Sequence, residues 1–163
     1  SIAFTSGIDS TYKEYVFEFI NMNPVTDQSG FQFNAATDGS TYDVIKTTTV
    51  FAAYHAEDNT SAGLGYEATW DLAQSTAYQT LANAVTNDAD MGVSGVLHLI
   101  NPASTTYVKN WYVTTVSVYD AATSQHNDFI AGYFNTTTAL NAIDFKFSSG
   151  NINAGKIKMY GIS

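Results

Sequence analysis

Residues 95–118, GVLHLINPASTTYVKNWYVTTVSV, have the pattern of a long β-hairpin and decide the fold. An apolar run at 96–100 is followed by the turn sequence Asn-Pro-Ala-Ser, and then by a run of β-branched and aromatic residues at 107–118. Pro102 presets its own φ for a turn and lacks an N–H group, so the first strand is expected to end near Asn101. A ribbon of this length is not stable alone, so other strands must complete a sheet that covers a core.

Further β-patterned runs fill most of the chain. Tyr15, Phe17 and Phe19 alternate along a predicted strand at 12–21 and are expected to face the core. The sequence Asp38-Gly39 separates two such runs, which predicts a hairpin turn. Residues 66–84 fit either an irregular strand or, around 80–85, a short helical turn. The other predicted strands are 30–36, 42–54, 128–135, 140–147 and 156–162, and the predicted loops are 55–65, 87–92, 121–127 and 148–155.

This spacing predicts an all-β protein, a jelly-roll-like β-sandwich of about nine to ten antiparallel strands. The 163 residues are expected to form a single domain, because they contain no linker, repeat or low-complexity tract. The chain begins with Ile2-Ala3-Phe4, which resembles the end of a strand. This start is consistent with a missing upstream segment.

The composition excludes several classes of function. The net charge is −9, with six lysines and no arginine, so the chain lacks the cations that displace counterions from nucleic acid. Without cysteine there is neither a disulfide nor a thiolate metal site or nucleophile. No window reaches the roughly 18 apolar residues of a membrane helix, so no membrane insertion is expected.

We expect no catalytic residues and therefore no enzyme. His98 lies on the opposite face of its strand from Leu97 and Leu99, as a solvated or hydrogen-bonded structural histidine would. His55 precedes Glu57 and Asp58, but no Gly-x-Ser-x-Gly sequence accompanies this group as a nucleophile elbow would. The four glutamates, Glu14, Glu18, Glu57 and Glu67, show no pairing that would indicate glycoside hydrolysis.

No cofactor is expected, with calcium kept as a minor alternative. Asp88 and Asp90 form an Asp-x-Asp pair in a predicted loop, and other aspartates lie in turns. Calcium takes six to eight oxygen ligands. Each acidic cluster supplies two carboxylates at most, which is ordinary for a turn.

The whole chain resembles a family of structural proteins of tailed bacteriophages, many of them from marine and cyanobacterial hosts. The sequence motifs that carry the resemblance belong to predicted strands and turns and include no catalytic signature. They are FTSGIDSTY at 4–12, YVF at 15–17, NP at 23–24, TDG at 37–39, LHL at 97–99, NP at 101–102, STT at 104–106, AGY at 131–133, SSGNI at 148–152 and KMYGI at 158–162.

The resemblance implies a virion-surface role without chemistry, as a capsid decoration or cement protein or as a tail-fibre module. Its implied partners are other virion proteins and further copies of itself in a homotrimer. A cementing face is expected on the Thr-rich strands at 47–50 and 114–118. Adhesion to a host-surface glycan would instead use the loops at 55–66 and 121–128, since loops on a rigid scaffold carry recognition.

Candidate recognition residues in and near these loops are His55, Asp58, Tyr66, Trp70 and His126. Exposed tyrosine and tryptophan stack on sugar rings or anchor protein interfaces. The alternative function is therefore a carbohydrate-binding module, in one form assisted by calcium.

Overall fold

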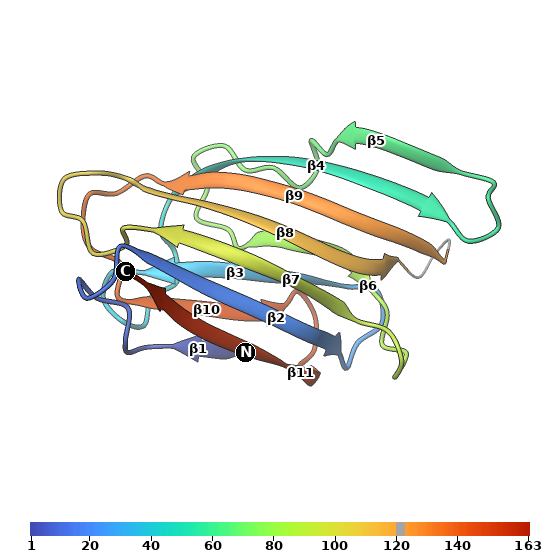
Figure 1. The fold of residues 1–163 in the computed structure, drawn as a ribbon, viewed down its shortest axis with the longest axis horizontal. Coiled ribbons are helices and arrows are strands. Elements are labelled where there is room, and N and C mark those ends of the chain that lie inside the picture. Colours follow the sequence, from blue (N-terminus) through green and yellow to red (C-terminus); the bar gives the residue numbers. More distant parts are fainter. Residues whose placement is uncertain (120–122) are drawn as a thin grey trace.

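The computed structural model describes residues 1–119 and 123–163, and they form eleven β-strands (Figure 1). These described residues contain no helix, and accordingly none that is long and apolar enough to cross a bilayer. The strands are β1 (Ile2–Phe4), β2 (Glu14–Pro24), β3 (Ser29–Ala36), β4 (Lys46–Ala56), β5 (Ala62–Tyr66), β6 (Gln79–Val85), β7 (Val93–Ile100), β8 (Lys109–Tyr119), β9 (Ser124–Phe134), β10 (Ala142–Phe147) and β11 (Ile152–Ile162).

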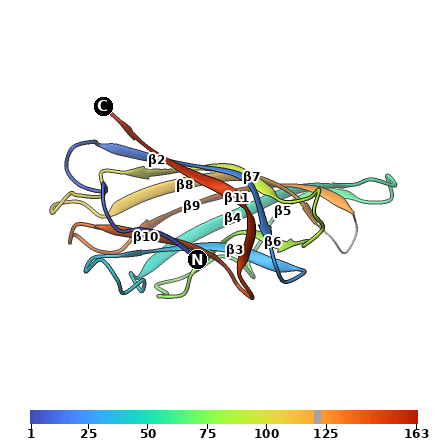
Figure 2. The same cartoon turned by 90° about the horizontal axis from the view of Figure 1, so that it is seen from below.

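The strands form two antiparallel layers in a flattened, elongated molecule (Figures 1 and 2). The larger layer has the order β5-β4-β9-β8-β7-β2-β11, and the smaller has the order β1-β10-β3-β6. One residue pair, Val85 with Tyr119, connects them through β6 and β8. The predicted all-β sandwich is confirmed, with eleven strands, whereas the jelly-roll topology stays a prediction.

The predicted hairpin is present as β7 and β8. Leu97 lies opposite Val113, and the first strand ends at Ile100, one residue before the expected position. Asn101 has a positive φ of 48°, and its carbonyl accepts a hydrogen bond from the Ser104 amide at 3.0 Å. The turn chemistry of Asn-Pro-Ala-Ser therefore closes the ribbon. The ribbon lies at the centre of the larger layer, between β2 and β9.

Aromatic side chains fill the space between the layers. Phe17 and Phe19 on β2 are fully buried, as their alternation predicted. Both contact Phe145 of the smaller layer, at ring-centroid distances of 5.4 and 5.1 Å. Phe33 meets Trp111 edge to face at 4.8 Å. Such offset and edge contacts add to the stabilisation from burial alone.

The Asp38-Gly39 hairpin prediction is wrong. Gly39 does have the positive φ of a turn, and the Asp38 carboxylate accepts hydrogen bonds from two following amides. The flanking strands are not paired, however: β3 pairs with β6 and β10, and β4 pairs with β5 and β9. The turn carries the chain from the smaller layer to the larger one.

Three predicted loops are partly strands. Most of 55–65 belongs to the β4–β5 hairpin, where every residue of β5 is exposed. Residues 124–127 of the predicted 121–127 loop begin β9, and its residues 121 and 122 lie outside the described part of the chain. Residues 152–155 begin β11 through a bulge. The 80–85 segment is strand β6 and not a helical turn.

Two lysines are buried on the core side of the larger layer. Phe134 on β9 pairs with Lys46 of β4 on one side and with Lys109 of β8 on the other. Both lysines are 0% exposed. The Lys46 ammonium donates to the Ala77 carbonyl at 2.5 Å, and Lys109 donates to two backbone carbonyls. Burial lowers the pKa of both groups, that of Lys46 to about 8, although Asp43 opposes the effect at Lys46.

Candidate functional site

A cavity of about 250 Å³ lies on the core-facing side of β4, β8 and β9, near the ends of these strands at the β4–β5 hairpin. Four of its side chains carry rings, and one carries a carboxylate. We call it the aromatic cavity, and its lining residues are Tyr54, Ala56, Ser61, Glu67, Trp70, Tyr119, Ser124 and His126.

Strand register brings the rings together. Tyr54 on β4 lies directly opposite His126 on β9, and Ser124 lies opposite Tyr119 on β8. Side chains two residues apart on a strand share a face, so all of them project to the same side. The His126 ring stacks on Tyr54 at a centroid distance of 5.6 Å and on Tyr119 at 4.9 Å.

The segment after β5 supplies the remaining wall. The Glu67 amide donates to the Val50 carbonyl of β4 at 2.9 Å, and the Trp70 amide donates to the Glu67 carbonyl at 3.1 Å. The Trp70 carbonyl accepts a hydrogen bond from the Gln79 side chain at 3.0 Å. Trp70 also packs against the hydrophobic core. These contacts fix the backbone that carries Glu67 and Trp70.

The cavity has a negative electrostatic character. The Glu67 carboxylate is partly buried and has no hydrogen bond or ion pair with any described residue. Burial lowers the pKa of His126, and the charge of Glu67 opposes this effect. No lysine is among the lining residues. Glu67 is therefore the one charged group of the cavity when His126 is neutral.

Asp128 lies next to the cavity on the same face of β9, two residues beyond His126. It is 1% exposed, and its Oδ1 atom has no hydrogen-bond partner. Burial raises the pKa of Asp128 to about 7; the hydrogen bond from Thr115 opposes the rise, and the nearby charge of Glu67 adds to it. Asp128 is not a lining residue. It interacts with the cavity through its electrostatic coupling to Glu67.

The structure brings together two of the five candidate recognition residues. Trp70 and His126 line the aromatic cavity, although His126 lies on β9 and not in a loop. Sequence reasoning missed Tyr54, Tyr119 and Glu67 as members of the site. Strand alternation gives a signal for Tyr54, which shares a face with Val50 and Ala52, but only the pairing of β4 with β9 places it beside His126.

The other three candidates lie elsewhere. His55 is exposed in the β4–β5 hairpin and interacts with Asn59 at 3.0 Å. Asp58 accepts hydrogen bonds from the Thr60 amide and hydroxyl, which lower its pKa, so its role is to form the turn. Tyr66 is 56% exposed and donates to Asp71 at 2.5 Å. The described part of the predicted 121–128 loop, residues 123–128, mostly belongs to β9.

A second surface of interest is the outward side of the larger layer. The Lys, Asp and Glu residues of β4, β8 and β9 are Lys46, Lys109 and Asp128, and all three point inward and are at most 1% exposed. The outward positions are therefore without carboxylates or ammonium groups. We call this surface the uncharged face, and its residues are Thr47, Thr49, Phe51, Asn110, Tyr112, Thr114, Val116, Phe129, Ala131 and Tyr133.

Aromatic rings lie flat against one another on the uncharged face. Phe51 and Phe129 stack at a centroid distance of 4.9 Å, and Phe51 remains 45% exposed. Tyr112 is 49% exposed and stacks on His98, which pairs with Glu14 at 2.5 Å. Two shallow grooves cross this face. His98 thus has the structural partners that were expected of it.

The Thr-rich strands contribute to the uncharged face through alternate residues. Thr47, Thr49 and Thr114 point outward, whereas Thr48 and Thr115 are buried. The predicted strands 47–50 and 114–118 lie in the same layer, with β9 between them.

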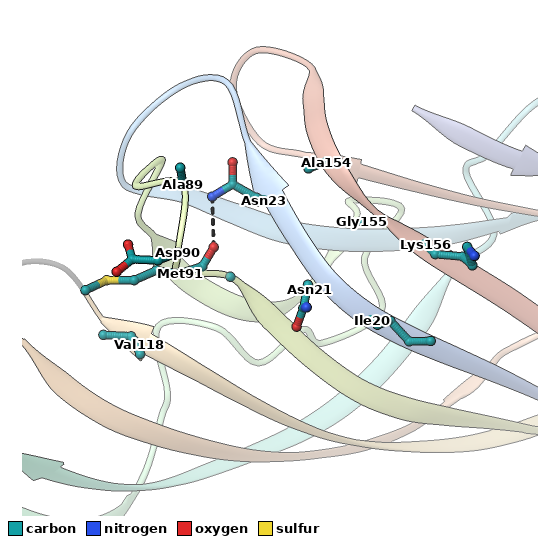
Figure 3. Close-up of a pocket in the computed structure, with 11 residues that line it drawn as sticks. Ile20, Asn21, Asn23, Ala89, Asp90, Met91, Val118, Ala154, Gly155 and Lys156 are labelled. Atoms are coloured by element: carbon teal, nitrogen blue, oxygen red, sulfur yellow. Dashed lines mark hydrogen bonds between the residues drawn. The ribbon is translucent and has the colours of Figure 1, made fainter.

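A larger, open depression of about 540 Å³ lies where β2 and β11 bulge, and Figure 3 shows the residues that line it. The Asn23 amide donates to three backbone carbonyls of the 86–91 segment, Met91 among them at 3.0 Å. These bonds fasten the loop to β2. Asp90 and Lys156 lie on opposite sides of the depression, and the described residues show no ion pair between them (Figure 3). The residues around the depression therefore serve to hold the 86–91 loop against β2.

Among residues 1–119 and 123–163, no three His, Asp or Glu side chains gather as ligands for a metal ion. The Asp88-Ala89-Asp90 sequence instead shapes the 86–91 loop, in which the Asp88 amide donates to the Thr86 hydroxyl.

Comparison of the chain with protein-family models, with curated proteins and with solved structures finds no match.

Proposed function

We propose that this protein is a non-enzymatic structural protein of a bacteriophage particle, displayed on the virion surface as a capsid decoration or cement protein or as part of a tail fibre. The observation that carries the proposal is the uncharged face. A chain with a net charge of −9 keeps all charge off the outward side of three adjacent strands and exposes aromatic rings there. Interface cores are depleted of charge and enriched in aromatic residues.

The uncharged face suits attachment to another virion subunit or to a further copy in a homotrimer. Exposed apolar patches of this kind mark protein-interaction sites. Threonine hydroxyls between the rings can satisfy polar groups of the partner without the desolvation cost of a charge. The resemblance of the chain to phage structural proteins supports the same role.

Electron microscopy of particles from the source phage, labelled with a gold-conjugated antibody against this protein, tests the proposal. Label over the heads supports decoration, and label at the tail tip supports a tail-fibre module. The absence of label from all particles would contradict a virion role.

A matched pair of variants tests the face. Phe51→Glu places a charge on the uncharged face, whereas Val25→Glu adds the same charge at a residue that is 54% exposed outside it. Loss of binding to particles that lack the protein is expected for Phe51→Glu alone. Equal binding by both variants would exclude this face as the attachment surface.

The alternative function, a carbohydrate-binding module, would use the aromatic cavity. Tryptophan and tyrosine rings bind the apolar faces of sugars, and the cavity contains Tyr54, Trp70 and Tyr119. A sugar that binds only the folded state would raise the melting temperature with its concentration. A calcium-assisted form would make this rise sensitive to a chelator.

A further inference from the structure

The aromatic cavity is distinct from the uncharged face, because its residues point to the opposite side of β4, β8 and β9. Tyr54 lies between Ala53 and His55, which point outward, and Ser117 and His126 face each other on the inner side. A ligand in this cavity would therefore leave the uncharged face free. Its binding can be tested independently of the proposed virion role.

Four hydrogen-bonding groups of the cavity are engaged with one another in two pairs. The Ser61 hydroxyl donates to the Tyr54 hydroxyl at 3.3 Å, and the Ser124 hydroxyl interacts with His126 Nε2 at 3.2 Å. No Asn, Gln, Lys or Arg side chain is among the lining residues. A neutral sugar, whose hydroxyls require several donors and acceptors, is therefore served poorly by this lining.

The charged group of the lining is the Glu67 carboxylate. It is partly buried without a cationic partner among the described residues, and its charge acts on both His126 and Asp128. A carboxylate in such surroundings is stabilised by an opposite charge, whose attraction is stronger there than in bulk water. A cation in the cavity would therefore complement Glu67.

The remaining lining specifies what kind of cation. Tyr54, Trp70 and Tyr119 contribute three aromatic rings to the lining, and cations are attracted to such rings through the ring quadrupole. A metal ion would need several oxygen ligands, and the cavity offers one carboxylate. An alkylated ammonium group carries its charge on an apolar surface and needs few hydrogen bonds.

We propose that the aromatic cavity binds a small organic ammonium group, held by the Glu67 carboxylate and by the rings of Trp70, Tyr54 and Tyr119. The cavity volume of about 250 Å³ suits a single head group of this kind. Choline, which carries a trimethylammonium group, is the probe of choice.

Calorimetric titration of the intact protein with choline tests this proposal, alongside titration with the uncharged isostere of choline in which a tert-butyl group replaces the trimethylammonium group. Binding of choline at least roughly tenfold tighter than binding of the isostere is expected, because only choline carries the charge. Equal affinity for both compounds, or no binding of choline, would overturn the proposal.

Two glutamates provide a matched pair of variants. Glu67→Gln removes the charge inside the cavity, and Glu57→Gln makes the same change at an exposed residue of the neighbouring turn. Glu67→Gln is expected to weaken choline binding roughly tenfold or more, and Glu57→Gln to leave it unchanged. Circular dichroism of both variants establishes that they are folded.

A panel of neutral monosaccharides completes the test. Sugar binding that persists in Glu67→Gln, without choline binding in the native protein, would overturn the ammonium proposal and favour the carbohydrate-binding alternative. Trp70→Ala should abolish choline binding while leaving attachment through the uncharged face intact. Failure of the ammonium proposal and failure of the virion role are therefore separate outcomes.

Discussion

Asp128 and Thr115 lie directly opposite each other on β9 and β8, and the Thr115 hydroxyl has both the Leu81 carbonyl and the Asp128 carboxyl within reach. Thr115 Oγ1 is 2.6 Å from the Leu81 carbonyl and 3.4 Å from Asp128 Oδ2. A carbonyl can only accept, so the threonine hydrogen belongs to the shorter bond. The bond from Thr115 to Asp128 is therefore weak, and the burial of the Asp128 carboxyl is poorly compensated.

This arrangement predicts that stability falls as pH rises through the neutral range. Burial raises the folded-state pKa of Asp128 from 3.8 to about 7, so the folded state binds more protons than the unfolded state between these values. The stabilisation is complete near pH 4 and lost above pH 7, and its upper limit is roughly 4 kcal/mol at about 1.4 kcal/mol per pKa unit. Glu67 and His126 are the neighbouring titratable groups.

Asp128→Asn should remove this pH dependence, because an amide donates to Thr115 at every pH. Urea unfolding at a series of pH values between 4 and 8 measures the effect, and the variant is expected to be the more stable protein at pH 8. Glu57→Gln is the control for loss of an exposed carboxylate. A parallel pH profile for Asp128→Asn and the native protein would contradict a buried, protonated Asp128.

The buried Lys46 predicts that the free energy of unfolding rises with pH in the alkaline range. Burial lowers its folded-state pKa from 10.5 to about 8, so the folded state binds fewer protons than the unfolded state between these values. The free energy of unfolding therefore gains a contribution as pH rises from 8 to 10, of roughly 3 kcal/mol at most.

Lys46→Met keeps the buried stem and removes the amine, so the variant should lack this gain. The difference between its unfolding free energy and that of the native protein is measured at pH 7 and pH 10, with exposed Lys13→Met as the control. Because the comparison is between variants, titration of tyrosines cancels. A constant difference across this range would show that Lys46 titrates normally.

The homotrimer that the resemblance to phage structural proteins implies should form through the uncharged face and depend on protein concentration. Phe51→Glu should weaken self-association by roughly 2 kcal/mol or more, the cost of losing a central aromatic contact in an interface. Sedimentation velocity of the native protein, Phe51→Glu and Val25→Glu measures this effect. A native protein that stays monomeric at high concentration would contradict the homotrimer.

The close packing around Gly132 predicts that one added methyl group lowers the stability of the fold. A Cβ atom there would lie 2.7 Å from the Thr47 carbonyl oxygen and 2.8 Å from the Trp111 ring. Gly132→Ala is therefore expected to destabilise the fold by roughly 1–3 kcal/mol.

Gly65→Ala is the matched control, because a Cβ atom at this residue of β5 meets nothing within 4 Å. Its expected effect is within about 0.5 kcal/mol. Thermal unfolding compares the two variants, and equal stabilities would show that the neighbours of Gly132 move apart freely.

The sequence predicted the parts of the fold that depend on local pattern. The β7–β8 hairpin and the inward face of β2 were predicted correctly, because turn residues and strict alternation coincide there. The hairpin prediction at Asp38-Gly39 was wrong, because the same turn residues are used in a hairpin and in a connection between two layers. Pairing partners of distant strands leave no trace in a local pattern.

The candidate site was only partly predictable for the same reason. Trp70 and His126 were chosen for their residue types, but their meeting with Tyr54 and Tyr119 depends on β4 pairing with β9 and β9 with β8. His126 was assigned to a loop because the start of β9 carries polar residues on both faces. The usual contrast between core and solvent is weak in that part of the strand.

The β4–β5 hairpin also has a practical consequence. All five residues of β5 are exposed, and the hairpin extends away from the smaller layer (Figure 1). Lengthening the connection at 57–61 would cost mainly loop-closure entropy, which grows slowly with length. The hairpin tip is therefore a natural graft point, at which a foreign peptide can be presented far from the aromatic core.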